Sequence, residues 1–161
     1  MSNLKTNAMR ILDKAGISYL THSYDHHDGS IDGVSVAKKL GQPVEKVFKT
    51  LVAQGTSKEY YVFVIPVAEE LDLKAAARTV GEKAVEMIKV ADINKVTGYI
   101  RGGCSPIGMK KQYKKVIDSS SLTQDTIIFS AGKIGYQIQM RPDDLIKTIH
   151  CKVASITAKK P

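Results

Sequence analysis

Tryptophan is absent from this chain, which has only two cysteines and 6% aromatic residues. So few aromatic side chains argue against an extensive platform for stacking nucleic-acid bases. The cysteines, Cys104 and Cys151, form no Cys-x-x-Cys pair, so a reducing cytoplasm is the expected location. No apolar run approaches the roughly 20 residues that a membrane-spanning helix needs. We therefore expect no membrane association.

Familiar catalytic motifs are also missing. Ser105 and Ser130 lie outside the Gly-x-Ser-x-Gly motif that is typical of many serine hydrolases. The loop Gly102–Gly108 has the glycine spacing of a phosphate-binding loop, but Met109-Lys110-Lys111 replaces the required Gly-Lys-Ser/Thr junction. Its glycines could present N–H groups to an oxyanion or a phosphate, or they could simply form a structural turn.

Metal and thiol chemistry receive little support. His22, Tyr24 and His26 would face one side of an extended strand, but no distant Cys/His pair complements them. We expect one of these side chains to line a cleft, and we expect no metal and no cofactor. Cys104 could act as a nucleophile, but the chain shows no recognisable signature of a partner base, which favours a small residue in a turn.

The chain has the size and composition of one ordinary globular domain. Its 161 residues, 43% hydrophobic and 25% charged, predict a single domain over residues 1–161. Residues 60–67 give the strongest strand pattern, and a short turn at 54–57 predicts antiparallel pairing with an apolar strand before it. Residues 33–40 and 73–80 are expected to be helical, whereas 83–90 fits either a helix or a strand. A mixed α/β (α+β) fold is expected.

The charge is strongly basic. A net charge of +8 and a pI of about 9.4 indicate an anionic partner such as nucleic acid, or merely a solvated basic surface. Four lysines, Lys110, Lys111, Lys114 and Lys115, directly follow the glycine-rich loop. This cluster favours contact with phosphates of a nucleic-acid backbone over readout of its sequence.

Lys49 is the most informative residue. It is the only Asp, Glu, Lys or Arg between Lys46 and Lys58, and it lies inside the apolar run Val47–Ala53. An ammonium in such a strand needs a cleft, a carboxylate partner or an anionic ligand. The alternative is a lysine that extends to solvent from a strand end, which its central position in the run makes less fitting.

Several segments in order along the chain resemble the YbaK/EbsC family, single-domain relatives of the editing domain inserted in bacterial prolyl-tRNA synthetases. The branch that the chain resembles most is that of the free-standing Cys-tRNA(Pro) deacylases. The segments that carry the resemblance are Ser23–His26, Val47–Leu51, Pro66–Ala68, Leu71–Lys74, Thr97–Tyr99, Gly102–Gly108 and Ser130–Lys133.

The resemblance implies a compact α/β fold around a twisted, largely antiparallel, barrel-like sheet with surrounding helices. It implies a trans-editing deacylase that removes cysteine from mischarged Cys-tRNA(Pro), with the substrate's own thiol attacking the ester. Its partners would be the acceptor end of tRNA(Pro) and prolyl-tRNA synthetase. Lys49 matches the family's essential lysine, and the matching substrate-binding positions are Tyr24, Thr50, Gly102, Gly103, Ser105, Pro106, Ser130 and Gly132.

One departure bears on specificity. Gln137 stands where the Cys-tRNA(Pro) branch has an aspartate. A deacylase for another small amino acid, such as alanine, therefore remains an alternative. A catalytically silent module of the same fold that binds tRNA or protein is another.

Overall fold

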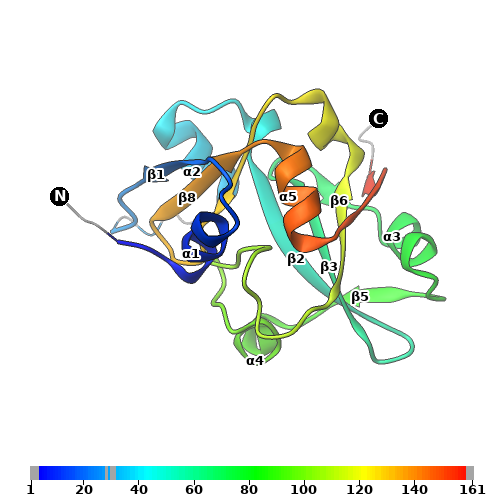
Figure 1. The fold of residues 1–161 in the computed structure, drawn as a ribbon. Coiled ribbons are helices and arrows are strands. Elements are labelled where there is room, and N and C mark those ends of the chain that lie inside the picture. Colours follow the sequence, from blue (N-terminus) through cyan, green and yellow to red (C-terminus); the bar gives the residue numbers. More distant parts are fainter. Residues whose placement is uncertain (1–3, 28, 30–31, 159–161) are drawn as a thin grey trace.

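The computed structural model describes residues 4–27, 29 and 32–158 (Figure 1). It is a mixed α/β fold. The α-helices are α1 (Asn7–Lys14), α2 (Gly33–Leu40), α3 (Leu73–Val80), α4 (Ile93–Thr97) and α5 (Pro142–Ile149). The 3-10 turns are η1 (Val44–Lys46), η2 (Val90–Asp92) and η3 (Ser119–Thr123). The strands are β1 (Leu20–Ser23), β2 (Phe48–Gly55), β3 (Tyr60–Pro66), β4 (Glu70–Leu71), β5 (Val85–Met87), β6 (Lys114–Asp118), β7 (Ile127–Ser130), β8 (Tyr136–Met140), β9 (Lys152–Ala154) and β10 (Thr157–Ala158).

The central sheet has the strand order β5-β2-β3-β6-β9. The predicted antiparallel pairing of β2 with β3 is confirmed, with a register that runs from Phe48 opposite Pro66 to Gln54 opposite Tyr60. β6 joins β3 in parallel, and β9 joins β6 in parallel. β2 therefore lies one position from the edge of this sheet, where only the short β5 covers it.

Two smaller sheets extend the central one. β1, β8 and β7 form an antiparallel sheet, and β4 pairs antiparallel with β10. A parallel bridge from Val47 to Ile128 joins the start of β2 to β7. This bridge connects the β1-β8-β7 sheet to the central sheet. Most strand pairs are antiparallel, as expected, although the described strands form three separate sheets.

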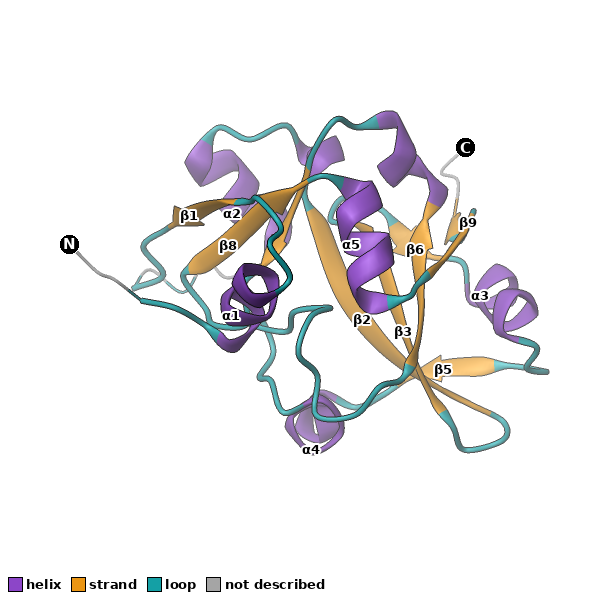
Figure 2. Cartoon of the chain, in the orientation of Figure 1, coloured by secondary structure: helices purple, strands orange, loops and turns teal. Residues whose placement is uncertain are grey.

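Both faces of the β2–β3 hairpin are buried. Val62 and Val64 share one cluster with Leu12 of α1 and Leu145 of α5. Phe63 packs on the opposite face with alanines of α3, as the alternation of side chains along a strand requires. Figure 2 shows α5 and α3 on different sides of the central sheet. Strands buried on both faces are nearly continuous apolar runs, which is why this hairpin was the clearest feature of the sequence.

Three details differ from expectation or resolve an open choice. The extended strand expected to carry His22, Tyr24 and His26 ends at Ser23, so only His22 lies within β1. The ambiguous 83–90 segment contains β5, followed by η2. Part of the polar 25–30 loop, including Asp28, lies outside the described residues. Among the residues described, no helix is both long and apolar enough to cross a bilayer.

Candidate functional site

A pocket of about 460 Å³ lies along β2. It is bounded by the β7–β8 sheet and the start of α2 on one side, and by the β5–α4 segment on the other. Five of the predicted site residues line it, namely Tyr24, Lys49, Thr50, Gly102 and Ser130. Residues from distant parts of the chain are thus brought to one strand.

The pocket exists because part of the edge of β2 is open. β5 pairs with β2 only from Ala53 to Gly55. The bridge to β7 is made by Val47, at the other end of the strand. Between these two contacts, the Phe48–Leu51 stretch pairs with β3 alone.

This open edge presents backbone hydrogen-bonding groups to the pocket. Val67 donates its N–H to the carbonyl of Val47 at 2.8 Å, so the odd-numbered residues of β2 direct their backbone groups toward β3. The even-numbered residues face the other way, and the carbonyl of Val52 accepts the N–H of Ile88 at 3.2 Å there. By the same alternation, the N–H and C=O of Thr50 face the pocket.

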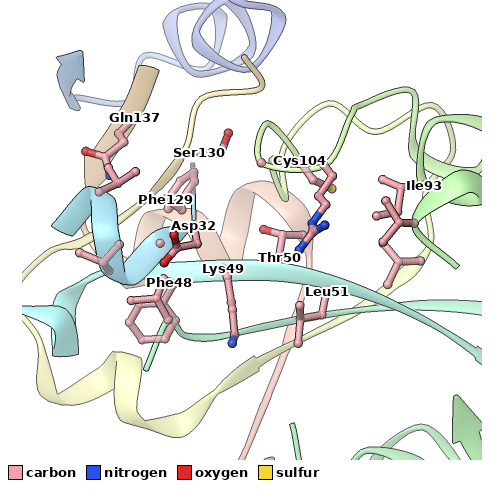
Figure 3. Close-up of a pocket in the computed structure, with 18 of the residues that line it drawn as sticks. Asp32, Phe48, Lys49, Thr50, Leu51, Ile93, Cys104, Phe129, Ser130 and Gln137 are labelled. Carbon is pink, nitrogen blue, oxygen red and sulfur yellow. The ribbon is translucent and has the colours of Figure 1, made fainter. Parts of the chain in front are cut away.

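Lys49 contributes a half-buried ammonium. Burial lowers the pKa of this ammonium below its usual 10.5, and the carboxylates of Glu70 and Glu69 oppose the shift. In the part of the chain that the structure describes, Lys49 makes no ion pair. Figure 3 shows its side chain on one side of β2, with Ser130 and Cys104 on the other. Lys49 is thus a lining residue of the pocket whose ammonium points to the other side of β2 from Ser130 and Cys104.

Polar side chains gather on the opposite side of the strand from that ammonium. The Oγ1 atom of Thr50 is buried and has no hydrogen-bond partner among the described residues. Buried polar atoms are nearly always paired, so this unpaired hydroxyl, in a residue that lines the pocket, is a candidate partner for a substrate. The hydroxyl oxygen of Ser130 accepts the N–H of Gly132 at 3.1 Å, which holds the turn after β7.

Four predicted substrate contacts do not line the pocket: Gly103, Ser105, Pro106 and Gly132. Ser105 is fully buried, and its hydroxyl accepts the N–H of Ile107 at 3.3 Å. A Cβ on Gly103 would lie 3.1 Å from the backbone nitrogen of Ile134, and one on Gly132 would lie 2.9 Å from the ring of Tyr99. These residues belong to the loops around the pocket, and their contact with a substrate stays a prediction.

The lysine cluster divides into exposed and buried members. Lys110, Lys111 and Lys114 are exposed. Lys115 is only 9% exposed, and its ammonium donates to the carbonyl of Tyr113 at 3.1 Å. Burial also lowers the pKa of Lys115. Because its side chain is buried, Lys115 is not placed to make the predicted contact with a phosphate.

Sequence reasoning missed several lining residues. Asp32, at the start of α2, accepts the N–H of Ser35 at 3.1 Å, and hydrogen bonding to Ser35 lowers the pKa of the Asp32 carboxyl. Arg101 and Cys104 line the pocket beside Gly102. Burial raises the pKa of the Cys104 thiol to about 11, so it is not a thiolate at neutral pH.

Gln137 also lines the pocket, and it is only 5% exposed. The Nε2 of Gln42 donates to the Oε1 of Gln137 at 2.8 Å, and the Nε2 of Gln137 donates back to the Oε1 of Gln42 at 3.4 Å. The position at which the sequence departs from its expected pattern thus lies in the pocket wall. Its partner, Gln42, carried no signal in the sequence.

Comparison with known proteins agrees with this geometry. Residues 31–148 match the family model of the aminoacyl-tRNA editing domain. Over 156 residues, 97% of this chain and 95% of the relative, the chain is 41% identical to a protein of Enterococcus faecalis (strain ATCC 700802 / V583) that is named as the Cys-tRNA(Pro)/Cys-tRNA(Cys) deacylase EbsC.

Solved structures share the fold. A protein described as a trans-editing enzyme for prolyl-tRNA synthetase superposes with a TM-score of 0.82 at 20% identity, covering 97% of this chain and all of the other. The hypothetical protein APE2540 superposes with a TM-score of 0.85 at 19% identity, covering 92% of this chain and 97% of the other. Because the family model covers most of the chain and the relative matches nearly all of it, this protein belongs to the aminoacyl-tRNA editing domain family.

Proposed function

We propose that the protein is a trans-editing deacylase that removes cysteine from mischarged Cys-tRNA(Pro). The observation that carries the proposal is the open edge of β2, where Lys49 and Thr50 line one pocket and the backbone N–H and C=O of Thr50 face it. These groups suit an ester, whose carbonyl oxygen gains negative charge when it is attacked. The E. faecalis relative carries the name of a deacylase with this substrate.

The pocket supports chemistry in which the substrate provides the nucleophile. The Cys104 thiol has its pKa raised to about 11, and none of the described residues that line the pocket is a histidine that could activate Ser130 or Cys104. In the proposed reaction, the sulfur of the cysteinyl group attacks its own carbonyl carbon. The bond from that carbon to the ribose oxygen breaks, and the thiol proton ends on the ribose hydroxyl. The products are free tRNA and a cysteine thiolactone, which water then opens.

The protein's contribution is positioning and electrostatic stabilisation. Prearranged intramolecular attack is worth up to roughly 7–11 kcal/mol relative to a bimolecular reaction. In our proposal the Thr50 N–H and the Lys49 ammonium stabilise the developing oxyanion, while Tyr24 and Ser130 orient the ribose and the amino group. The Lys49 ammonium lies across β2 from Ser130 (Figure 3), so the role proposed for it requires the side chain to change its rotamer when the substrate binds.

The rest of the tRNA would lie on the basic surface beside α4. The Lys110 N–H donates to the carbonyl of Thr97 at 3.0 Å, and its ammonium donates to the carbonyl of Lys95 at 3.1 Å. The exposed lysines Lys110, Lys111 and Lys114 thus begin next to the helix that contributes Ile93 to the pocket. We infer that they contact phosphates of the acceptor stem, in the cytoplasm, with prolyl-tRNA synthetase as the enzyme whose errors are corrected.

A second candidate amino acid follows from Gln137. Its amide supplies a neutral wall where a carboxylate was expected, and a neutral wall could accept alanine in place of cysteine. Alanine has no thiol, so its removal would require attack by water.

A panel of charged tRNAs tests the proposal. The protein is incubated with tRNA(Pro) carrying cysteine, alanine or proline, and with tRNA(Cys) carrying cysteine, and the rate of deacylation is measured. We expect Cys-tRNA(Pro) to be cleaved fastest and Pro-tRNA(Pro) to be spared. Faster cleavage of Ala-tRNA(Pro) would favour the second candidate, and binding of every tRNA without turnover would reduce the protein to a silent module.

A further inference from the structure

The pocket has two chemically different ends. Tyr24, Asp32 and Gln137 line one end, beside apolar residues such as Val36 and Phe129. The other end lies between β5 and α4, and its four lining residues, here called the apolar shelf, are Met87, Ile88, Val90 and Ile93. Figure 3 shows Gln137 at one end and Ile93 at the other, with Thr50 between them and the Lys49 side chain on the opposite side of β2. Thr50 therefore lies where the two ends meet.

The apolar shelf is exposed without an evident packing reason. Met87 is 43% exposed and Val90 is 57% exposed. Single exposed apolar residues are ordinary on protein surfaces. These two, however, adjoin two isoleucines in the wall of one pocket, and a contiguous apolar patch in a concave site marks a place for a ligand.

An aminoacyl ester also has two different ends. The aminoacyl group is small and carries a cationic amino group, whereas the terminal adenosine is larger and carries a flat aromatic base. The carboxylate of Asp32 and the oxygens of Tyr24 and Gln137 suit the amino group. Methionine and branched aliphatic side chains suit the face of a base, because a methionine thioether is polarizable and adapts to a flat ring.

We propose that the apolar shelf binds the adenine of the tRNA's terminal adenosine, with the aminoacyl group toward Gln137 and the ester bond between them at Lys49 and Thr50. This assignment rests on the proposed function, because it presumes an aminoacyl-tRNA substrate. It goes further than the proposed function because it states how the two ends of the substrate are oriented along β2. It also accounts for a pocket of about 460 Å³, more than one small aminoacyl group fills.

The charges beside the two ends agree with this direction. Arg101 lines the pocket, and Lys89 follows Ile88 in the chain. Glu86 of β5 adds one negative charge here, and Lys95 pairs with Asp92 at 3.7 Å. The exposed Lys110, whose ammonium donates to the Lys95 carbonyl at 3.1 Å, adds positive charge. A nucleotide on the shelf would direct its 5′-phosphate, and the rest of the tRNA, toward cations and away from Asp32.

The first test needs no turnover. Adenosine 5′-monophosphate is titrated into the wild-type protein with labelled methyl groups, and NMR shifts are followed, with cytidine 5′-monophosphate as the control nucleotide. We expect saturable shifts at Met87, Val90 and Ile93 that are larger with the adenine nucleotide, and none at Val36 on α2. Shifts confined to Val36, or no shifts at millimolar nucleotide, would overturn the assignment.

The second test compares two matched variants. Val90 and Leu122 are both apolar, are 57% and 54% exposed, and lie in the 3-10 turns η2 and η3. Val90→Asp should raise KM for Cys-tRNA(Pro) about ten-fold, since contact with a base is commonly worth about 1–3 kcal/mol. Val90→Ser, which introduces no charge, should raise KM as well. Leu122→Asp should leave KM unchanged.

The outcomes separate the shelf from the proposed function. An unchanged KM in Val90→Asp overturns the adenosine assignment while deacylation stands. A loss limited to association with prolyl-tRNA synthetase would overturn it in favour of a protein contact. A wild-type protein that cleaves no charged tRNA refutes the proposed function, and the nucleotide titration still decides whether the shelf binds adenine.

Discussion

The side-chain amides of Gln42 and Gln137 form two reciprocal hydrogen bonds, of 2.8 and 3.4 Å, at the polar end of the pocket. Gln42 follows α2 and Gln137 lies in β8, so this pair ties together two elements that are 95 residues apart. The pair also fixes which face of the Gln137 amide remains for a substrate. We therefore expect selectivity at this end of the pocket to depend on Gln42, which does not itself line it.

Loss of Gln42 should destabilise the protein more than its partial exposure suggests. Gln42→Ala leaves the buried Gln137 amide unpaired, which typically costs about 1–3 kcal/mol. We expect the free energy of unfolding, measured in urea, to fall by that amount, and the double variant Gln42→Ala/Gln137→Ala to be less destabilised than the sum of the single variants. Gln54→Ala is the control, because Gln54 bonds only to the Lys58 carbonyl in an exposed hairpin. Additive effects of the two glutamine substitutions would show that the bonds contribute nothing.

Cys104 should be dispensable although it lines the pocket. Burial raises the pKa of its thiol to about 11, so the nucleophilic thiolate forms only at alkaline pH. We expect Cys104→Ala to retain deacylation within about three-fold, well below the 10²–10³-fold loss typical of a group that stabilises the transition state. The rate at which iodoacetamide modifies Cys104 should rise with pH up to about 11. Rapid modification at pH 7 together with lost activity would restore it as a nucleophile.

The lysines at positions 110, 111, 114 and 115 should differ in their contribution to tRNA binding. Exposed Lys111 is placed to contact phosphate, and buried Lys115 is not. Lys111→Ala should reduce the slope of log affinity for tRNA against log salt concentration by about 1, whereas Lys115→Met should leave that slope unchanged. The measurement is a tRNA binding titration at several salt concentrations. A smaller slope in Lys115→Met would return this lysine to the tRNA surface.

Local signals explain which parts of the fold could be predicted. α2 and α3 were placed correctly because each ends before a glycine, Gly41 or Gly81, whose φ of +66° or +76° few other residues adopt comfortably. The β2–β3 hairpin is long and apolar, which makes its pattern clear. In contrast, β5 has only three residues and lies at a sheet edge, so no period could separate it from a helix.

The site was predictable only in part, for a similar reason. Lys49 was found because a charge inside an apolar strand needs an explanation, but its direction depends on the register between β2 and β3. Ser105 matched a motif, yet its complete burial results from long-range packing. The apolar shelf draws on β5, η2 and α4, which are neighbours in the chain but carry no recognisable motif.

Replacement of Lys49 should lower the rate of deacylation. In our proposal its ammonium stabilises the developing oxyanion, so Lys49→Ala should lower kcat for Cys-tRNA(Pro) at least about 100-fold. Lys49→Arg should not restore kcat, because a planar guanidinium does not reproduce the position of an ammonium. Lys58→Ala, in the exposed hairpin turn after β2, is the control and should be fully active. Wild-type rates in Lys49→Ala would remove this residue from the mechanism.

The difference in stability between wild type and Lys49→Met should change with pH in a direction that the pKa of Lys49 dictates. Burial lowers the pKa of Lys49 in the folded state below 10.5, so at neutral pH the charged ammonium costs the fold more than it costs the unfolded chain. Between the lowered pKa and 10.5 the unfolded chain binds more protons, and wild-type stability gains from rising pH in this window. Lys49→Met, which has no charge to desolvate, should thus be more stable than wild type in urea unfolding at pH 7. The difference should shrink as the pH rises toward 10.5, and a difference that grows with pH would show that the carboxylates of Glu70 and Glu69 outweigh the desolvation of the ammonium.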